Sequence, residues 1–264
     1  MLLTAKGIWD VVNYNFVPWG NAYYNSSLLS ACPGWSGAAK YERGTFPCWA
    51  ALCNTTNAPT ECFTGEKLCQ HTDSECAGDT IEACAKYAYP SPTLYAPFIY
   101  CLEGMNGYYN NSIGGVNMSM AGACATQAGL DVAPIQACYE DKSLTNALDA
   151  EAARATARAA GKVPASDWGT PYVVVNGEHL DDTSQLLSQV CGAWAAQDGT
   201  TLPEGCPGAK WHVQYWWKWQ EGVALGVGAG GMLVLVLLMW LVVCCCCPKR
   251  DRPAQSPLLY AGGS

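Results

Sequence analysis

One uncharged apolar segment divides the chain into two unequal parts. Val223 to Val243 is a run of 21 residues without a charged side chain. As a helix it would be about 31 Å long, close to the roughly 30 Å of a bilayer's hydrocarbon core. An aromatic juxtamembrane segment (208–222) precedes it, and a Lys/Arg cluster follows it in the 244–264 tail. Because basic residues accumulate on the cytoplasmic side, the pattern predicts a single transmembrane helix with a cytoplasmic tail and residues 1–207 in a lumen or outside the cell.

Cysteine content predicts an oxidising compartment for that amino-terminal part. The chain holds 16 cysteines, and twelve of them precede the apolar segment, spread along the sequence rather than gathered into one metal-ligand cassette. Four Asn-x-Ser/Thr sequons on the same side predict glycosylation, at Asn25, Asn54, Asn110 and Asn117. Charged residues make up only 14% of the chain and the net charge is -8, which excludes nucleic acid as a partner bound through phosphate neutralisation.

The amino terminus does not match this lumenal placement. Met1 to Asp10 lacks the basic region and continuous apolar core of a signal peptide. A lumenal domain therefore requires either that the anchor itself directs insertion or that the true amino terminus lies upstream of Met1.

Hydrophobic periodicity before residue 208 predicts a mixed α/β domain. The pattern predicts helices over 2–12, 69–87, 95–103, 134–138 and 144–160, another from the Asp181/Asp182 cap to 194, and strands at 15–18, 172–175 and 178–180, the last two joined by an Asn176-Gly177 turn. Segment 24–66 is rich in Gly, Pro, Asn, Thr and Cys and has little periodicity. We interpret it as a disulfide-tied insertion.

The densest group of chemically active residues begins at Cys69. Cys69, His71 and Cys76 could in principle hold zinc, but Cys-x-His-x4-Cys does not match the usual zinc spacings. In an oxidising lumen the two thiols would be joined, so we expect a disulfide and no metal. His71 could act as a proton donor or pH sensor, or simply make structural hydrogen bonds.

The same residues carry a family resemblance. Cys69-Gln70-His71-x3-Glu75-Cys76-x2-Asp79-x4-Cys84 resembles the C-Q-H-G-x2-E-C-x2-N-x4-C signature of the gamma-interferon-inducible lysosomal thiol reductase family. The spacing is intact, with Thr72 in place of the family's Gly and Asp79 in place of its Asn. Three flanking segments are similar to family segments as well: Val17 to Ala22, Pro171 to Gly177 and Leu186 to Cys191.

This resemblance implies a thioredoxin-like domain over 1–207 that reduces protein disulfides in endosomes or lysosomes without a cofactor. In the family a CxxC pair precedes the Val17 to Gly20 strand by some thirty residues, which here falls upstream of Met1. We therefore expect an extension that encodes a signal peptide, the first strand and the redox pair, and we expect the chain as given to be inactive and its 15–18 strand to lack its central partner. Pro171, by resemblance, is the cis-proline that faces the redox pair.

The remaining lumenal cysteines are disulfide candidates. Eight cysteines fall where the family has cysteines, and the 24–66 insertion adds four, so all twelve can pair. Besides Cys69, Cys76 and Cys84, the cysteines at family positions are Cys101, Cys124, Cys138, Cys191 and Cys206. The pairing cannot be deduced from the sequence, although we favour Cys191 with Cys206.

Two features belong to the anchor and tail. Cys244, Cys245, Cys246 and Cys247 lie at the cytoplasmic end of the span beside basic residues, a placement typical of S-palmitoylation, although they could simply complete the apolar helix. Gly222, Gly226 and Gly230 share one helical face and favour a homodimer through the span. The alternative overall function is a non-catalytic, disulfide-rich membrane receptor or adhesion module on the same scaffold.

Overall fold

The computed structural model describes residues 4–104, 116–198, 201–207 and 258–262. The described residues belong to two compact units: a larger one of residues 13–104 and 116–183 with the strand at 258–262, and a smaller one of residues 4–12 with 184–198 and 201–207. The larger unit holds both sheets, six α-helices and the Cys69 signature. Its mixture of helices and small sheets agrees with the α/β class expected from the sequence.

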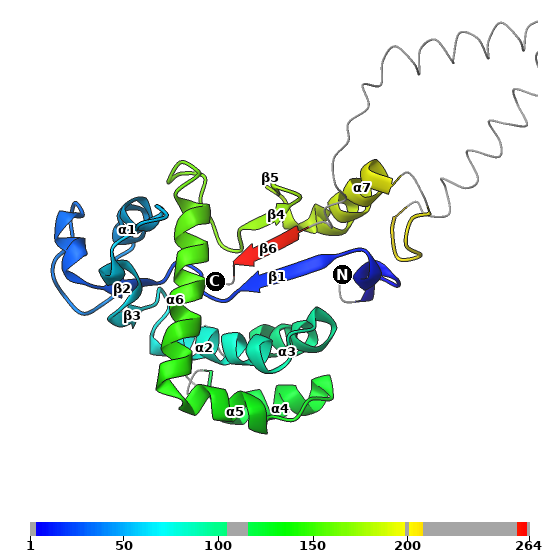
Figure 1. The fold of residues 1–264 in the computed structure, drawn as a ribbon, viewed down its shortest axis with the longest axis horizontal. Coiled ribbons are helices and arrows are strands. Elements are labelled where there is room, and N and C mark those ends of the chain that lie inside the picture. The colour runs from blue at the N-terminus through cyan, green and yellow to red at the C-terminus, as the bar shows by residue number, and fades with distance from the viewer. Residues whose placement is uncertain (1–3, 105–115, 199–200, 208–257, 263–264) are drawn as a thin grey trace, which may run out of the picture. The chain divides into compact units, whose positions relative to one another are not determined.

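A four-stranded sheet of order β1-β6-β4-β5 runs through the larger unit (Figure 1). β6 (Leu258–Gly262) lies between β1 (Asn13–Val17) and β4 (Val173–Val175), parallel to β1 and antiparallel to β4. The expectation that the first strand would lack a neighbour is therefore wrong for this structure. β6 has no counterpart among the predicted strands, because residues 258–262 fall within the predicted cytoplasmic tail.

The predicted hairpin at 172–180 is confirmed. β4 turns into β5 (Glu178–His179) through Asn176 and Gly177, whose φ angles are 51° and 90°. Two consecutive residues with positive φ define the tight turn that suits the twist of an antiparallel pair.

One edge of β1 is covered by helix side chains. The carbonyl of Tyr14 accepts from the Tyr95 hydroxyl at 3.1 Å, and the carbonyl of Phe16 accepts from Lys86 Nζ at 2.7 Å. Alternate residues of a strand direct their carbonyls to the same side, so both groups lie along one edge. These bonds satisfy backbone groups that would otherwise remain open to pairing with another chain.

The helices follow the sequence prediction in the middle of the unit and depart from it elsewhere. The bounds are α1 (Thr45–Cys53), α2 (Asp73–Ala88), α3 (Pro92–Gly104), α4 (Met118–Ala128), α5 (Ala133–Glu140) and α6 (Lys142–Ala160). Helices α2, α3, α5 and α6 correspond to predicted segments. Figure 1 shows α2 to α5 gathered on one side of β1, and disulfides join α2 to α5 (Cys84–Cys138) and α3 to α4 (Cys101–Cys124).

The 24–66 segment is tied by its own disulfides, as expected, and it also contributes to the hydrophobic core. It contains β2 (Tyr23–Asn25), which pairs antiparallel with β3 (Glu66–Leu68), two 3₁₀ turns (Ser27–Ala31 and Thr60–Phe63) and α1. Its aromatic residues pack with Trp19 against four buried alanines of α6: Ala152, Ala153, Ala157 and Ala160. Small side chains on α6 let the bulky rings of α1 approach closely, which explains why an Ala-rich helix forms this interface.

The smaller unit contains a 3₁₀ helix (Ile8–Asp10) and the helix α7 (Leu186–Asp198). The Cys191–Cys206 disulfide joins α7 to the segment at 201–207. The prediction of a helix over 2–12 is wrong for the described residues. Gly7 has φ 74°, the left-handed conformation, which interrupts a right-handed helix at that point.

Several expectations concern residues outside the described ranges. These are the 208–222 segment, the predicted span at 223–243 with its glycines, the four cysteines at 244–247 and the sequon at Asn110. Among the residues that are described, no helix is both long and apolar enough to cross a bilayer.

Candidate functional site

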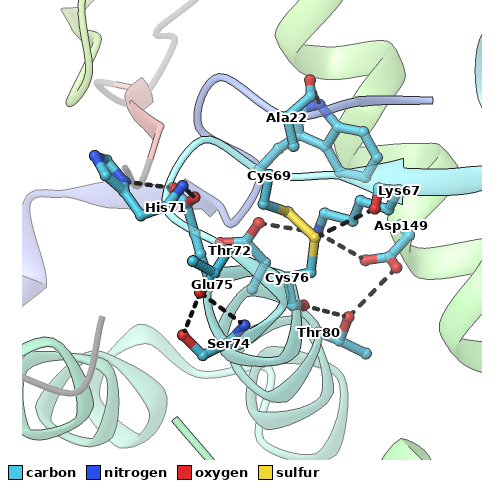
Figure 2. The surroundings of a disulfide bond; sticks show 12 residues. Ala22, Lys67, Cys69, His71, Thr72, Ser74, Glu75, Cys76, Thr80 and Asp149 are labelled. Atoms are coloured by element: carbon cyan, nitrogen blue, oxygen red, sulfur yellow. Dashed lines mark hydrogen bonds and ion pairs between the residues drawn. A yellow bond between two sulfur atoms is a disulfide. The ribbon is translucent and has the colours of Figure 1, made fainter. Parts of the chain in front are cut away.

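The family signature lies where β3 leads into α2. Cys69 directly follows β3, and Cys76 lies at the end of the first turn of α2. Their sulfur atoms form a disulfide with 5.6 Å between the Cα atoms, shown at the centre of Figure 2. The expected disulfide between these two cysteines is therefore present. Cys84, the last signature cysteine, is buried and paired with Cys138.

His71 and Glu75 close the loop between these cysteines. The backbone N–H of His71 donates to Glu75 Oε2 at 2.6 Å, and His71 Nδ1 lies 3.3 Å from Glu75 Oε1 (Figure 2). The Glu75 side chain is only 3% exposed, while His71 is about one third exposed. Glu75 therefore binds the amide just before the start of α2, in the manner of a capping box, and the imidazole is held beside it.

Thr72 occupies a backbone conformation that favours glycine. It is the N-cap residue of α2, has φ 102°, and its side chain accepts from the backbone N–H of Ser74 at 3.4 Å. Glycine adopts such a φ without steric conflict, whereas a β-branched residue is strained there. This explains in physical terms why the family pattern has Gly at this position.

Asp79 is paired with a buried lysine. Lys67 Nζ lies 2.9 Å from Asp79 Oδ2 and 3.5 Å from Asp149 Oδ1, and Asp79 is 1% exposed. The ammonium also lies 4.3 Å from the centre of the Trp19 ring, a cation–π distance. The Asp149 carboxylate further contacts the Thr80 hydroxyl, which donates to the carbonyl of Cys76 (Figure 2). The cluster thus lies beside the signature disulfide.

Burial dominates the electrostatics of this cluster. Burial lowers the pKa of Lys67, but Asp79 and Asp149 together raise it above its ordinary value. Burial raises the pKa of Asp79 from 3.8 to about 7; Lys67 opposes the rise, and Glu75 and Asp149 add to it. One ammonium faces two carboxylates, so it cannot fully compensate both.

Pro171 lies in a loop built from stacked rings. The Thr170–Pro171 peptide bond is cis, as the resemblance implied. The ring of Trp168 stacks on Tyr172 at a centroid distance of 4.7 Å, and Tyr172 stacks on His179 at 4.3 Å. Trp168 also stacks on Phe46 of α1 at a centroid distance of 5.7 Å. Trp168 also lines a small apolar pocket of about 160 Å³ between α1 and the end of α6.

All twelve cysteines of the described residues are disulfide-bonded. Beyond the pairs already given, Cys32 joins Cys48 and Cys53 joins Cys62 within the 24–66 segment. The structure also makes the Cys191–Cys206 pair favoured from the sequence. Thiol–disulfide exchange begins with a free thiolate, so none of these cysteines is ready to act as a nucleophile in this state.

Three sequons fall within the described residues. Asn117 is exposed and caps α4, accepting from the backbone N–H groups of Ser119 and Met120. Asn54 Nδ2 donates to the carbonyl of Gly161 at 3.3 Å, and Asn25 lies half-buried in β2. Of the three described sequon asparagines, Asn117 is exposed, and Asn25 and Asn54 are half-buried.

Sequence reasoning did not find Lys67, Asp149 or Trp168. Lys67 and Asp149 are 82 positions apart in the sequence, and no local pattern connects them. A lysine inside a short strand and a tryptophan shortly before a proline are the weak signals that were available.

Comparison with known proteins points to one family. Residues 46–128 match the family model described as "Gamma interferon inducible lysosomal thiol reductase (GILT)". This stretch contains the whole Cys69 to Cys84 signature, and the match supports the family resemblance.

Two curated relatives carry related names. The chain is 29% identical over 159 residues to "Gamma-interferon-responsive lysosomal thiol protein" of Arabidopsis thaliana, covering 55% of this chain and 60% of that protein. It is 26% identical over 186 residues to "Gamma-interferon-inducible lysosomal thiol reductase" of Mus musculus, covering 64% of this chain and 67% of that protein. The chain thus spans about two thirds or less of these relatives' length. No solved structure matches it.

Proposed function

We propose that this chain is part of a thiol reductase of the gamma-interferon-inducible family, with a thioredoxin-like domain that reduces protein disulfides in the endosomal or lysosomal lumen. The observation that carries the proposal is the family match over residues 46–128, which includes the complete signature and its closed Cys69–Cys76 disulfide. The name of the mouse relative, a lysosomal thiol reductase, supports both the chemistry and the compartment.

The chemistry requires a dithiol in addition to the described cysteines. One thiolate attacks a sulfur of the substrate disulfide, a mixed disulfide forms, and the other substrate sulfur leaves as a thiolate. The second enzyme thiol then attacks the mixed disulfide, so the substrate gains two electrons and the enzyme pair becomes oxidised. We place this pair on a CxxC segment upstream of Met1, facing Pro171, and no cofactor is needed.

The assay compares two forms of the protein at acidic pH, with a small thiol as electron donor and a disulfide-linked peptide as substrate. The form extended upstream is expected to reduce the peptide, and the 264-residue form is expected to be inactive. An extended variant with both CxxC cysteines changed to serine is the matched control. Equal activity of the extended form and this control would overturn the proposal.

We also propose that residues 223–243 anchor the protein in a membrane. This anchoring is incompatible with the pairing of β6 with β1 and β4. A single span would place residues 258–262 on the opposite side of the membrane from β1, whereas in the structure they form β6 beside β1 and β4. Protease treatment of sealed microsomes containing a carboxy-terminally tagged chain distinguishes the two arrangements. Digestion of the tag supports the span, and a protected tag with β6 in place contradicts it.

A second candidate is a non-catalytic receptor or adhesion module. The observation that favours it is the complete pairing of the twelve described cysteines. An in-frame stop codon directly before Met1, together with an inactive 264-residue chain, would favour this candidate over the reductase.

A further inference from the structure

Gln70 of the signature is linked to the Pro171 loop through one intervening side chain. Asn21 Nδ2 donates to Gln70 Oε1 at 2.7 Å, and Trp168 Nε1 donates to Asn21 Oδ1 at 2.8 Å. All three side chains are half-buried. Residues 21, 70 and 168 belong to three separate segments, each within or next to a stretch that resembles the family, and the two bonds tie these segments together.

The chemistry of the indole fixes the direction of both bonds. An indole N–H can only donate, so the Asn21 atom that faces Trp168 must be the carbonyl oxygen. The Asn21 amide nitrogen then faces Gln70, which must present an acceptor. The relay therefore requires an acceptor, and no particular charge, at position 70.

Trp168 transmits this constraint to the proline. Trp168 and Tyr172 stack at 4.7 Å with 22° between their planes, and the Thr170–Pro171 bond lies between them in the sequence. A second aromatic neighbour, Phe46, has its ring centroid 5.7 Å from that of Trp168. A ring that stacks on two others and is hydrogen-bonded at its edge has a defined orientation, and the loop that carries it is defined as well.

We propose that Gln70 is a positioning residue for the Pro171 loop, acting through Asn21 and Trp168. The relay itself depends only on the hydrogen bonds described; its importance for catalysis rests on the proposed function, in which Pro171 faces the redox pair. A glutamate at position 70 would preserve the relay, and an apolar side chain of similar length would break it.

The test measures hydrogen exchange at the Trp168 indole in the 264-residue chain, by NMR of the solubilised protein. The Trp168 resonance is assigned by its loss in Trp168→Phe. In Gln70→Met we expect a shifted resonance and exchange about tenfold faster, because the hydrogen bond that orients Asn21 is lost. Gln70→Glu is expected to restore wild-type exchange, and Gln136→Met, which removes an exposed glutamine of α5, serves as the matched control.

An internal reference separates loop positioning from general loosening. The indole of buried Trp49 donates to the carbonyl of Cys62 at 3.1 Å, a hydrogen bond that is not part of the relay. Faster exchange at Trp168 with unchanged exchange at Trp49 supports the proposal. Unchanged exchange at Trp168 in Gln70→Met, or equal acceleration at both indoles, would overturn it. The readout needs no reductase activity, so it stands even if the proposed function fails.

Discussion

Replacing Asp79 by asparagine tests how one buried carboxyl couples the stability of this domain to pH. The change keeps the shape of the side chain and introduces the residue that the family pattern has at this position. It removes a group that is 1% exposed and lies 2.9 Å from Lys67 Nζ. Lys67 retains Asp149 as a partner at 3.5 Å, so the variant leaves no buried ammonium without a counter-charge.

The expected magnitude follows from the pKa of Asp79. Burial raises this pKa from 3.8 to about 7, so the folded state holds the proton more tightly than the unfolded state. The stabilisation that this tighter proton binding gives to the folded state is fully present below pH 3.8 and is lost as the pH rises to about 7. Each pKa unit corresponds to about 1.36 kcal/mol, which gives a loss of up to ~4 kcal/mol across this range. The raised pKa therefore favours the fold in an acidic compartment.

The assay is urea unfolding of the wild type and Asp79→Asn at about pH 4 and about pH 7, with disulfides intact. Between about pH 4 and about pH 7 the free energy of unfolding of the wild type should fall by roughly 2–4 kcal/mol more than that of the variant. The range allows for relaxation around the buried cluster. Asp73→Asn makes the same chemical change at an exposed position of α2 and should behave like the wild type. If the wild type and Asp79→Asn lose the same stability, the reasoning about the buried cluster is wrong.

Three further predictions concern the signature and the tail. Thr72→Gly should stabilise the domain by about 1 kcal/mol in urea unfolding, because relief of the strained φ of 102° outweighs the loss of a long, exposed cap bond; a destabilised variant would contradict this. Acyl-exchange labelling should detect S-palmitoylation at Cys244–Cys247 and lose the signal in the four-serine variant, whereas equal labelling would exclude it. Joint replacement of Gly226 and Gly230 by Leu should weaken self-association of the span in a membrane reporter assay, and an unchanged signal would argue against the dimer.

The elements that could be predicted are those with a strong local pattern. The apolar face of α2, the Ala-rich α6 and the Asn176-Gly177 turn each follow from a few neighbouring residues. Helix α1 was missed because the segment around it is rich in glycine, proline and cysteine and shows no period. The predicted helix at 2–12 failed at Gly7, where a single left-handed residue outweighs apolar spacing.

The site could be predicted only as far as its residues are neighbours in the sequence. The closure of Cys69 with Cys76 followed from compartment and spacing, and the structure shows that bond. The buried cluster and the Gln70 relay include partners that are far apart in the sequence: Lys67 and Asp149 are 82 positions apart, Gln70 and Asn21 are 49 apart, and Trp168 and Asn21 are 147 apart. Such contacts arise from packing of the whole domain, and no local pattern encodes them.

At each of the two positions that depart from the family signature, the structure shows an interaction that compensates for the unfavourable residue. Thr72 is strained by its positive φ, and its hydroxyl compensates in part by capping α2. Asp79 introduces a buried charge, and Lys67 approaches it from β3. The Cys69–Cys76 disulfide and the Glu75 bond to the His71 amide fix the loop that carries Thr72, whereas Asp79 lies in α2 and is held by Lys67. Because each unfavourable residue has its own compensating contact, the spacing of the signature persists where its side chains have changed.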